Sequence, residues 1–442
     1  MNNIINLQYS SSNTLEMSTP ETRYNNPSVD LKMNSNMVKE SEPQNSQSIN
    51  GNIISINKSK NSDSTNGSST NNNNSSQKEI IDKEKDEERR IRVIKELEEK
   101  REIKEKETKK EKERIRKALL KVTSIVTNKN GLNNLGNTCY MNTCLQLLIH
   151  CSPFLDKLFT EVPTEKLSKE FYNLCNEQLL ECTSPINLKN IFSIKHKLYK
   201  GSRQHDTQEF CRLFLEDISN EMNKVKIIPP YIELDNYGKS KIQLNYEYDK
   251  IFKRREDSIV VDTFYGQTIN IFKCKCGYES YSYQKFLDVP LLFVGKGNQK
   301  LNVLLEKFFE GDDKIEWGID CDNCFKKQLH KKIVKIAYPP EILILSLQRY
   351  NSKTNTKNNA EVNFSETIDL KKFADKDCCG EFSTKYHLIG VGNHYGEMNF
   401  GHYYAFINIE KEWFEFNDSS CFPCQIFNKS SQTAYILVYQ RE

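Results

Sequence analysis

Cys139 is the residue whose type and position first suggest chemistry. It follows a loop that contains Gly131 and Gly136, and apolar residues at helical spacing come after it, so we expect a helix that starts close to Cys139. The positive end of a helix dipole stabilises a thiolate. The loop would also let backbone N–H groups and Asn134 approach a developing oxyanion. This context favours a nucleophile over a buried structural cysteine.

A nucleophilic cysteine requires a base and a group that orients the base. His402 lies between a glycine and a predicted strand, and Asn417 and Asp418 follow an aromatic strand at 413–416. An amide or carboxylate on a neighbouring strand can hold the tautomer of an imidazole. Each residue alone would mean little, since an Asn-Asp pair usually marks a turn. The order Cys, His, Asn along the chain predicts a thiol nucleophile with a base and a group that orients the base.

Four further cysteines have the spacing of a metal site. Cys274 and Cys276 form one close pair, and Cys321 and Cys324 form a second pair further along the chain. Four thiolates in two close pairs can form a tetrahedral zinc site that joins two loops. The alternative is a set of thiols without metal. We favour a structural Zn²⁺ site that is coordinatively closed and has no catalytic role.

The first 121 residues differ in composition from the rest of the chain. Residues 1–78 are dominated by Asn and Ser and have little apolar surface to bury, so we expect a disordered tail. In residues 79–121, 31 of 43 side chains are charged, and acids often precede bases by four positions, which supports an exposed helix. We favour a solvated single helix. A weak coiled coil, a helix that binds a protein partner and a nucleic-acid patch stay open as alternatives.

Helices come first and strands later in the remaining residues, 131–442, which we expect to form the catalytic domain. Further helices are predicted near 165–180 and 206–223. Short aromatic and β-branched runs predict strands at 260–264, 269–273, 342–350, 387–391, 403–407, 413–416 and 435–439. This order is typical of an α+β fold.

The charge and the hydropathy pattern exclude several classes of protein. The formal net charge of +3 lies in the 79–121 segment, since residues 122–442 hold 40 basic and 40 acidic side chains. That balance argues against nucleic acid as a partner. We find no secretion signal and no apolar run near the ~20 residues that span a bilayer. We therefore expect an intracellular protein, cytoplasmic or nuclear, with no membrane partner and with reduced cysteines.

Several stretches resemble motifs of the ubiquitin-specific proteases, a papain-like family of deubiquitinating cysteine peptidases. The segment 131–146 resembles the family's Cys box, and the segment 386–406, with Gly401-His402-Tyr403, resembles its His box. Three more matches lie at 204–210, 339–350 and 434–439. They occur in family order over roughly 310 residues, so the resemblance is specific.

The resemblance assigns roles to residues of this chain. Cys139 would be the nucleophile, His402 the general base and Asn417 the residue that orients it. Asn134 matches the asparagine that stabilises the oxyanion, and Asp418 matches an adjacent acid that assists Asn417 or partly substitutes for it.

The resemblance also implies how the substrate is held. Asp206 matches an aspartate that contacts the basic tail of ubiquitin, although His205 replaces a glutamine of that motif. His394 would line the channel for the tail. The implied fold is a papain-like cysteine protease with a helical thumb, a β-rich palm and zinc-pinned β fingers, the fingers being an insert at about 260–335.

The expected function is a deubiquitinating thiol protease. It would hydrolyse isopeptide or peptide bonds after the C-terminal glycine of ubiquitin, with ubiquitin and ubiquitinated proteins as partners and with no organic cofactor. Two alternatives stay open. One is a ubiquitin-binding scaffold without turnover, and the other is a protease for a ubiquitin-like modifier.

Overall fold

The computed structural model describes residues 73–442 except 237, 296, 310–313, 352–353, 355, 398–399 and 425–426. The tail predicted at residues 1–78 lies outside the described residues up to residue 72. The helices are α1 Asn73–Val126, α2 Cys139–Ile149, α3 Ser152–Glu161, α4 Lys166–Glu177, α5 Ile186–Lys195, α6 Thr207–Glu221, α7 Lys241–Lys253, α8 Ile259–Phe264, α9 Leu301–Phe309 and α10 Lys376–Cys379, with the 3-10 turns η1 Lys197–Tyr199 and η2 Lys371–Phe373.

The strands fall into one large sheet and three smaller ones. The large sheet contains β3 Asp288–Leu292, β7 Ile342–Gln348, β11 Thr367–Asp369, β12 Lys385–Gly396, β13 Gly401–Ile409, β14 Glu412–Asn417, β15 Ser420–Pro423 and β17 Ala434–Arg441. A second sheet contains β1 Gly266–Cys274, β2 Glu279–Phe286, β5 Lys314–Asp320 and β6 Lys327–Tyr338. The short strands are β4 Gln299–Lys300, β8 Tyr350–Asn351, β9 Thr356–Lys357, β10 Val362–Asn363 and β16 Ser430–Ser431.

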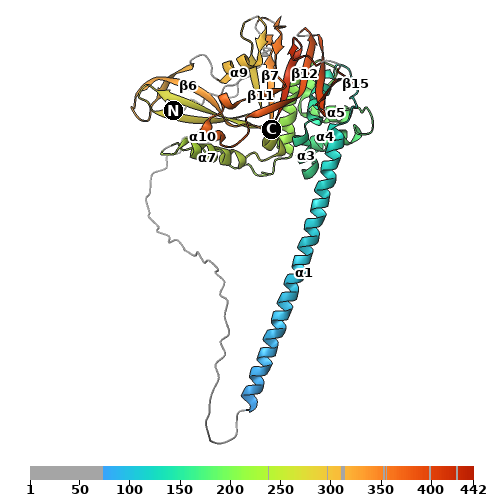
Figure 1. Ribbon diagram of the computed structural model, residues 1–442, viewed down its shortest axis with the longest axis vertical. Coiled ribbons are helices and arrows are strands. Elements are labelled where there is room, and N and C mark those ends of the chain that lie inside the picture. Colours follow the sequence, from blue (N-terminus) through green and yellow to red (C-terminus); the bar gives the residue numbers. More distant parts are fainter. Residues whose placement is uncertain are drawn as a thin grey trace, which may run out of the picture. The chain divides into compact units, whose positions relative to one another are not determined.

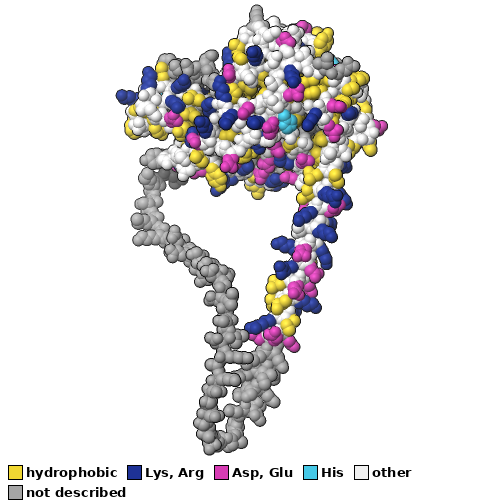
Figure 2. Space-filling model, in the orientation of Figure 1, with side chains coloured by type: hydrophobic (Ala, Val, Ile, Leu, Met, Phe, Trp, Pro, Cys, Tyr) yellow, Lys and Arg dark blue, Asp and Glu magenta, His cyan; other side chains and the backbone are white. Residues whose placement is uncertain are grey.

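Most of α1 carries exposed ion pairs instead of buried apolar side chains. Exposed ion pairs one turn apart recur along it, at Arg92–Glu96, Glu102–Lys106 and Glu113–Lys117. Each such pair contributes only ~0.3–0.5 kcal/mol. Figure 2 shows the basic and acidic side chains interspersed along the helix. Its last turns differ, because Val122 and Ile125 are buried in the main core. The helix starts six residues before the predicted 79–121 segment and ends five residues after it.

The helix that starts at Cys139 is buried along its whole length, and it contacts β13 and α6. Two of its amides reach back to the loop that precedes it. Asn142 Nδ2 donates to the Leu132 carbonyl at 3.1 Å, and Gln146 Nε2 donates to the Asn130 carbonyl at 3.1 Å. The two amide nitrogens are thus paired with backbone carbonyls, and these bonds fix the loop in front of Cys139.

The large sheet runs in the order β15-β14-β13-β12-β17-β7-β3, with β11 beside β12. Figure 1 labels β7, β11, β12 and β15 of this sheet. Its described pairs are antiparallel apart from β3 with β7. Alternation along β17 places Ile436 and Val438 in the core that contains α2, whereas Leu437 and Tyr439 join the core on the other side. The strands predicted at 342–350, 387–391, 403–407, 413–416 and 435–439 are confirmed as β7, β12, β13, β14 and β17.

The second sheet runs in the order β2-β1-β6-β5. Leu244 of α7 packs with Ile269 and Ile271 of β1 in a small core of its own. This sheet extends to the end of β1, where Cys274 pairs with His330. Cys274 and Cys276 therefore lie at the end of β1 in this second sheet, and Cys321 and Cys324 follow its strand β5.

One predicted strand is wrong. The run 260–264 lies in helix α8, because Ser258 caps it by accepting a hydrogen bond from the Val261 N–H. Most of this helix is buried, and a short apolar run does not distinguish a buried helical turn from a strand. The helices α3, α5, α7, α9 and α10 were not predicted. In the described part of the chain, we find no helix with the length and apolar character needed to cross a membrane.

Candidate active site

Cys139 is the first residue of α2 and is buried. The loop before it turns sharply, with left-handed backbone angles at Gly136 (φ 86°) and Asn137 (φ 57°). Asn134 holds this turn, because its Oδ1 accepts the N–H groups of Gly136 at 2.9 Å and Thr138 at 3.1 Å. The N–H groups of a first helical turn have no partner inside the helix. In α2 the Met141 N–H already donates to the Thr138 carbonyl at 3.0 Å, so the N–H groups of Cys139 and Tyr140 remain for an oxyanion next to the thiol.

His402 contacts both Cys139 and Asn417. Its Nε2 lies 2.7 Å from Asn417 Oδ1. A hydrogen bond to Cys139 is the largest cause that raises the pKa of His402 to about 9, burial opposes it, and Asn417 and the charge of Asp418 add to it. Asn417 engages Nε2, which leaves Nδ1 of the ring for the thiol. Asn417 is itself oriented by its Nδ2, which donates to Glu415 Oε1 at 3.2 Å.

Asp418 connects the loop before Cys139 to the end of β14. Its Oδ2 accepts from Asn134 Nδ2 at 2.8 Å, and its Oδ1 accepts from Asn142 Nδ2 at 2.8 Å. Its Oδ2 also lies 4.0 Å from His402 Nε2, too far for a hydrogen bond. A Cβ at Gly131 would lie 2.4 Å from the Asp418 carbonyl oxygen, so glycine is required there. In the structure Asp418 anchors two amides, and its assistance to Asn417 stays a prediction.

Asp206 and His394 line the same cleft, which has a volume of about 580 Å³ and also includes Tyr350, Phe400 and Tyr403. Asp206 caps α6, since its Oδ1 accepts the N–H groups of Gln208 and Glu209 at 2.7 and 3.0 Å. Its Oδ2 accepts from the Tyr435 hydroxyl. Burial raises the pKa of Asp206. The carboxylate is thus engaged inside the chain while it borders the cleft.

Residues near the cleft that sequence reasoning missed include Gln204. Its Nε2 donates to the Gly401 carbonyl at 3.0 Å, and its Oε1 accepts the Gly401 N–H at 3.2 Å. These two hydrogen bonds connect the loop before α6 to Gly401, the residue before His402. The match at 204–210 contained the signal, but only the fold shows what Gln204 reaches. His205 instead packs on Tyr199, with ring centroids 4.2 Å apart.

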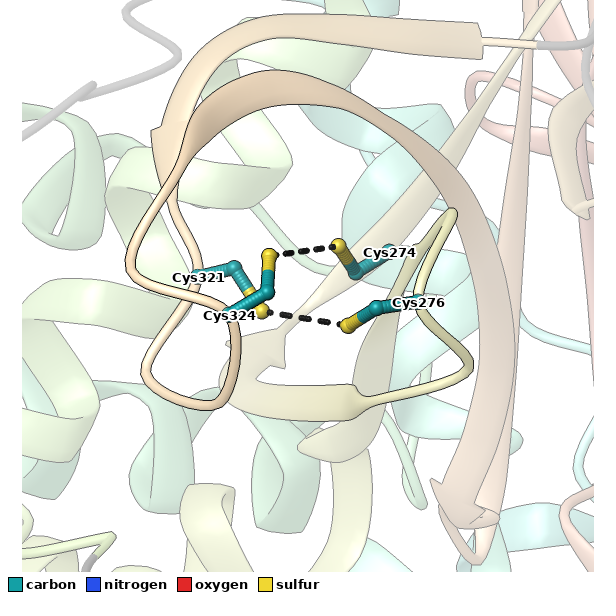
Figure 3. A group of neighbouring side chains, drawn as sticks. All are labelled: Cys274, Cys276, Cys321 and Cys324. Carbon is teal, nitrogen blue, oxygen red and sulfur yellow. Dashed lines mark hydrogen bonds between the residues drawn. The ribbon is translucent and has the colours of Figure 1, made fainter.

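The four cysteines come together as a group whose sulfurs all lie within 4.8 Å of one another (Figure 3). Cys274 Sγ is 3.9 Å from Cys324 Sγ, and Cys276 Sγ is 3.6 Å from Cys321 Sγ. Tetrahedral Zn–S bonds of about 2.3 Å place neighbouring sulfurs about 3.8 Å apart, so the spacing fits such an ion. Gln328 Nε2 donates to Cys274 Sγ at 2.6 Å, as expected beside a ligand sulfur that carries negative charge. The group can hold a metal ion.

We compared the chain with models of known protein families. The family model described as "Ubiquitin carboxyl-terminal hydrolase" matches residues 130–439. The chain belongs to this family. The α+β, papain-like fold is confirmed by this match together with the structural likeness below.

Curated relatives support the same family. Ubiquitin carboxyl-terminal hydrolase Usp2 of Drosophila melanogaster is 29% identical over 329 residues, which cover 70% of this chain and 34% of that protein. Ubiquitin carboxyl-terminal hydrolase 4 of Saccharomyces cerevisiae is 30% identical over 368 residues, with 70% and 39% covered. Ubiquitin carboxyl-terminal hydrolase 21 of Homo sapiens is 29% identical over 352 residues, with 70% and 61% covered. The chain thus spans between one third and three fifths of the length of these relatives.

A solved structure shares the fold. The SAGA DUB module of Ubp8, Sgf11, Sus1 and Sgf73 bound to monoubiquitin aligns with a TM-score of 0.56 and 24% identity. The alignment covers 71% of this chain and 69% of that one. At this identity the likeness shows the arrangement of the elements.

Proposed function

We propose that residues 131–442 form a deubiquitinating thiol protease that hydrolyses isopeptide or peptide bonds after the C-terminal glycine of ubiquitin. One observation carries this proposal: His402 Nε2 lies 2.7 Å from Asn417 Oδ1, and Cys139, at the N-terminus of the buried helix α2, is the largest cause of the raised pKa of His402. The family to which the chain belongs supplies the substrate class.

The proposed mechanism uses the residues in these positions. The Cys139 thiolate attacks the carbonyl carbon, and Asn134 with nearby backbone N–H groups stabilises the tetrahedral oxyanion. His402 gives its proton to the leaving amine, and a thioester remains on Cys139. His402 then takes a proton from water, which attacks the thioester and releases the carboxylate and the free thiolate, while Asn417 keeps the imidazole oriented.

We propose that the tail of ubiquitin binds in the cleft beside Asp206 and His394. Both residues line this cleft, and Gln204 connects it to the residue before His402. An extended tail in this position would run toward Cys139. A carboxylate at the cleft suits a basic tail, and the buried ring of His394 supplies an uncharged wall.

We further propose that the group of Cys274, Cys276, Cys321 and Cys324 binds structural Zn²⁺. The sulfur spacing and the Gln328 donor support this assignment. A closed set of four thiolates would hold the loops after β1 and β5 together, and it leaves no position for substrate.

The decisive experiment is labelling with ubiquitin that carries a C-terminal electrophile. Wild type should form a covalent adduct, and Cys139→Ala should bind ubiquitin without one, while metal analysis of the same samples gives one zinc per chain. Adduct formation by Cys139→Ala would overturn the assignment of the nucleophile. Binding without an adduct in wild type would identify a scaffold, and labelling by a different modifier alone would identify another substrate.

A further inference from the structure

The ring of His394 is held by two side chains from a neighbouring hairpin. Strands β8 and β9 pair Tyr350 with Lys357. The Tyr350 hydroxyl lies 2.7 Å from His394 Nδ1, and Lys357 Nζ lies 3.0 Å from the same nitrogen. Lys357 Nζ also donates to the carbonyls of His394 at 3.0 Å and Gly396 at 2.7 Å. The three protons of the ammonium thus have three acceptors.

This geometry fixes the protonation of the imidazole. Burial, with the charge of Arg349, lowers the pKa of Lys357 to about 8, so at pH 7 its amine is an ammonium. An ammonium group only donates hydrogen bonds, so at that pH Nδ1 is the acceptor and carries no proton. The proton of the neutral ring therefore lies on Nε2, beside Gly401, where a Cβ would lie only 2.1 Å from that nitrogen. A second proton on the ring would place N–H against the ammonium. Burial, with the charges of Lys357 and His402, lowers the pKa of His394 to about 4, in agreement with a neutral ring.

Strand pairing connects the residues that Lys357 holds to the neighbours of His402. His394 pairs with Tyr403 and Gly396 pairs with Gly401 between β12 and β13, so His402 lies between two residues whose partners Lys357 holds. His394 and Tyr350 also line the cleft. Lys357 does not line it and does not contact Cys139 or His402 in the described structure. Its effect on substrate would pass through His394.

We propose that Lys357 is a positioning residue that locks His394 as the neutral Nε2–H tautomer and thereby preforms the wall of the substrate cleft. The proposal rests on the proposed function for its consequence in turnover. Its first half concerns only the ring and can be tested without activity.

The test uses Lys357→Met, which keeps most of the side-chain volume and removes the donors, and Lys357→Arg, which restores positive charge. Lys376→Met, an exposed lysine of α10, is the matched control. Nitrogen-15 NMR of the imidazoles, with His394 assigned through His394→Gln, reports the tautomer. We expect only Nε2–H in wild type and in the control. In Lys357→Met we expect a mixture of tautomers and a higher pKa, because a nearby positive charge is lost.

Turnover of ubiquitin with a fluorogenic leaving group gives the second measurement. We expect Lys357→Met to raise KM about tenfold with kcat within about twofold, and Lys357→Arg to recover part of the loss. If Lys357→Met misfolds, Tyr350→Phe is the second variant. It removes the Tyr350 hydroxyl and keeps Lys357 next to Nδ1, so the Nε2–H tautomer of His394 should persist. An unchanged tautomer and pKa in folded Lys357→Met, or a fall in kcat at constant KM, overturns the proposal. An inactive wild type with an intact Nε2–H signal would instead refute the proposed function alone.

Discussion

The role of Asp418 can be separated from that of Asn417 by an isosteric substitution. Asp418 accepts one hydrogen bond from Asn134 and one from Asn142, both at 2.8 Å. In Asp418→Asn one carboxylate oxygen becomes an amide nitrogen, which cannot accept from either neighbour. Losing one hydrogen bond to a charged group costs about 1.5–3 kcal/mol. We expect kcat/KM to fall about 10- to 100-fold when Asn134 is no longer held for the oxyanion.

The substitution should also move the pH dependence. The negative charge of Asp418 contributes to the raised pKa of His402, which is about 9. The imidazolium form persists below that pKa, so removing the anion lowers the pKa and the form is lost at a lower pH. The alkaline limb of the kcat/KM profile of Asp418→Asn should therefore shift toward neutral pH relative to wild type.

The assay is hydrolysis of ubiquitin carrying a fluorogenic leaving group between about pH 6 and pH 10, a range that brackets the usual and the raised pKa of histidine. Asp86→Asn, on the exposed part of α1, is the matched control and should behave as wild type. Activity of Asp418→Asn within twofold of wild type would refute the anchoring role. A different result would show that Asp418 orients His402 directly: Asn417→Ala alone stays active, and the variant that combines Asn417→Ala with Asp418→Asn is inactive.

Two further substitutions test how the site is supported. Arg349 is buried, and its guanidinium donates to the carbonyls of Ala434, Asn358, Ala360 and Ser431. Arg349→Met should lower the free energy of unfolding by about 2–4 kcal/mol in denaturant titrations, because these acceptors lose their donors. A loss below about 1 kcal/mol would contradict this. Gly401→Ala would place Cβ against His394 Nε2, so kcat/KM should fall at least about a hundredfold, whereas Gly297→Ala, with open space around it, should keep wild-type turnover.

Prediction from the sequence succeeded where the signal is local. The start of the helix at Cys139 follows from the glycine loop and the apolar spacing after it, and the structure has α2 beginning there. The strand predicted at 260–264 failed because burial and a serine cap, rather than periodicity, make it the helix α8. The short helix α9 was missed within a region that reads as strands.

The sequence by itself determined which chemical groups this protein has, since the cysteine, histidine and amide types and their order are covalent facts. The tertiary structure decided which atoms meet. Asn134 and Asp418 stand 284 residues apart, and Lys357 reaches His394 across 37. Such pairings depend on strand register and on side-chain rotamers, which are set by packing across the whole domain and leave no periodic signal in the chain. For this reason the bonds of Asp418 to Asn134 and Asn142, and the contact of Lys357 with His394, emerged only once the fold was known.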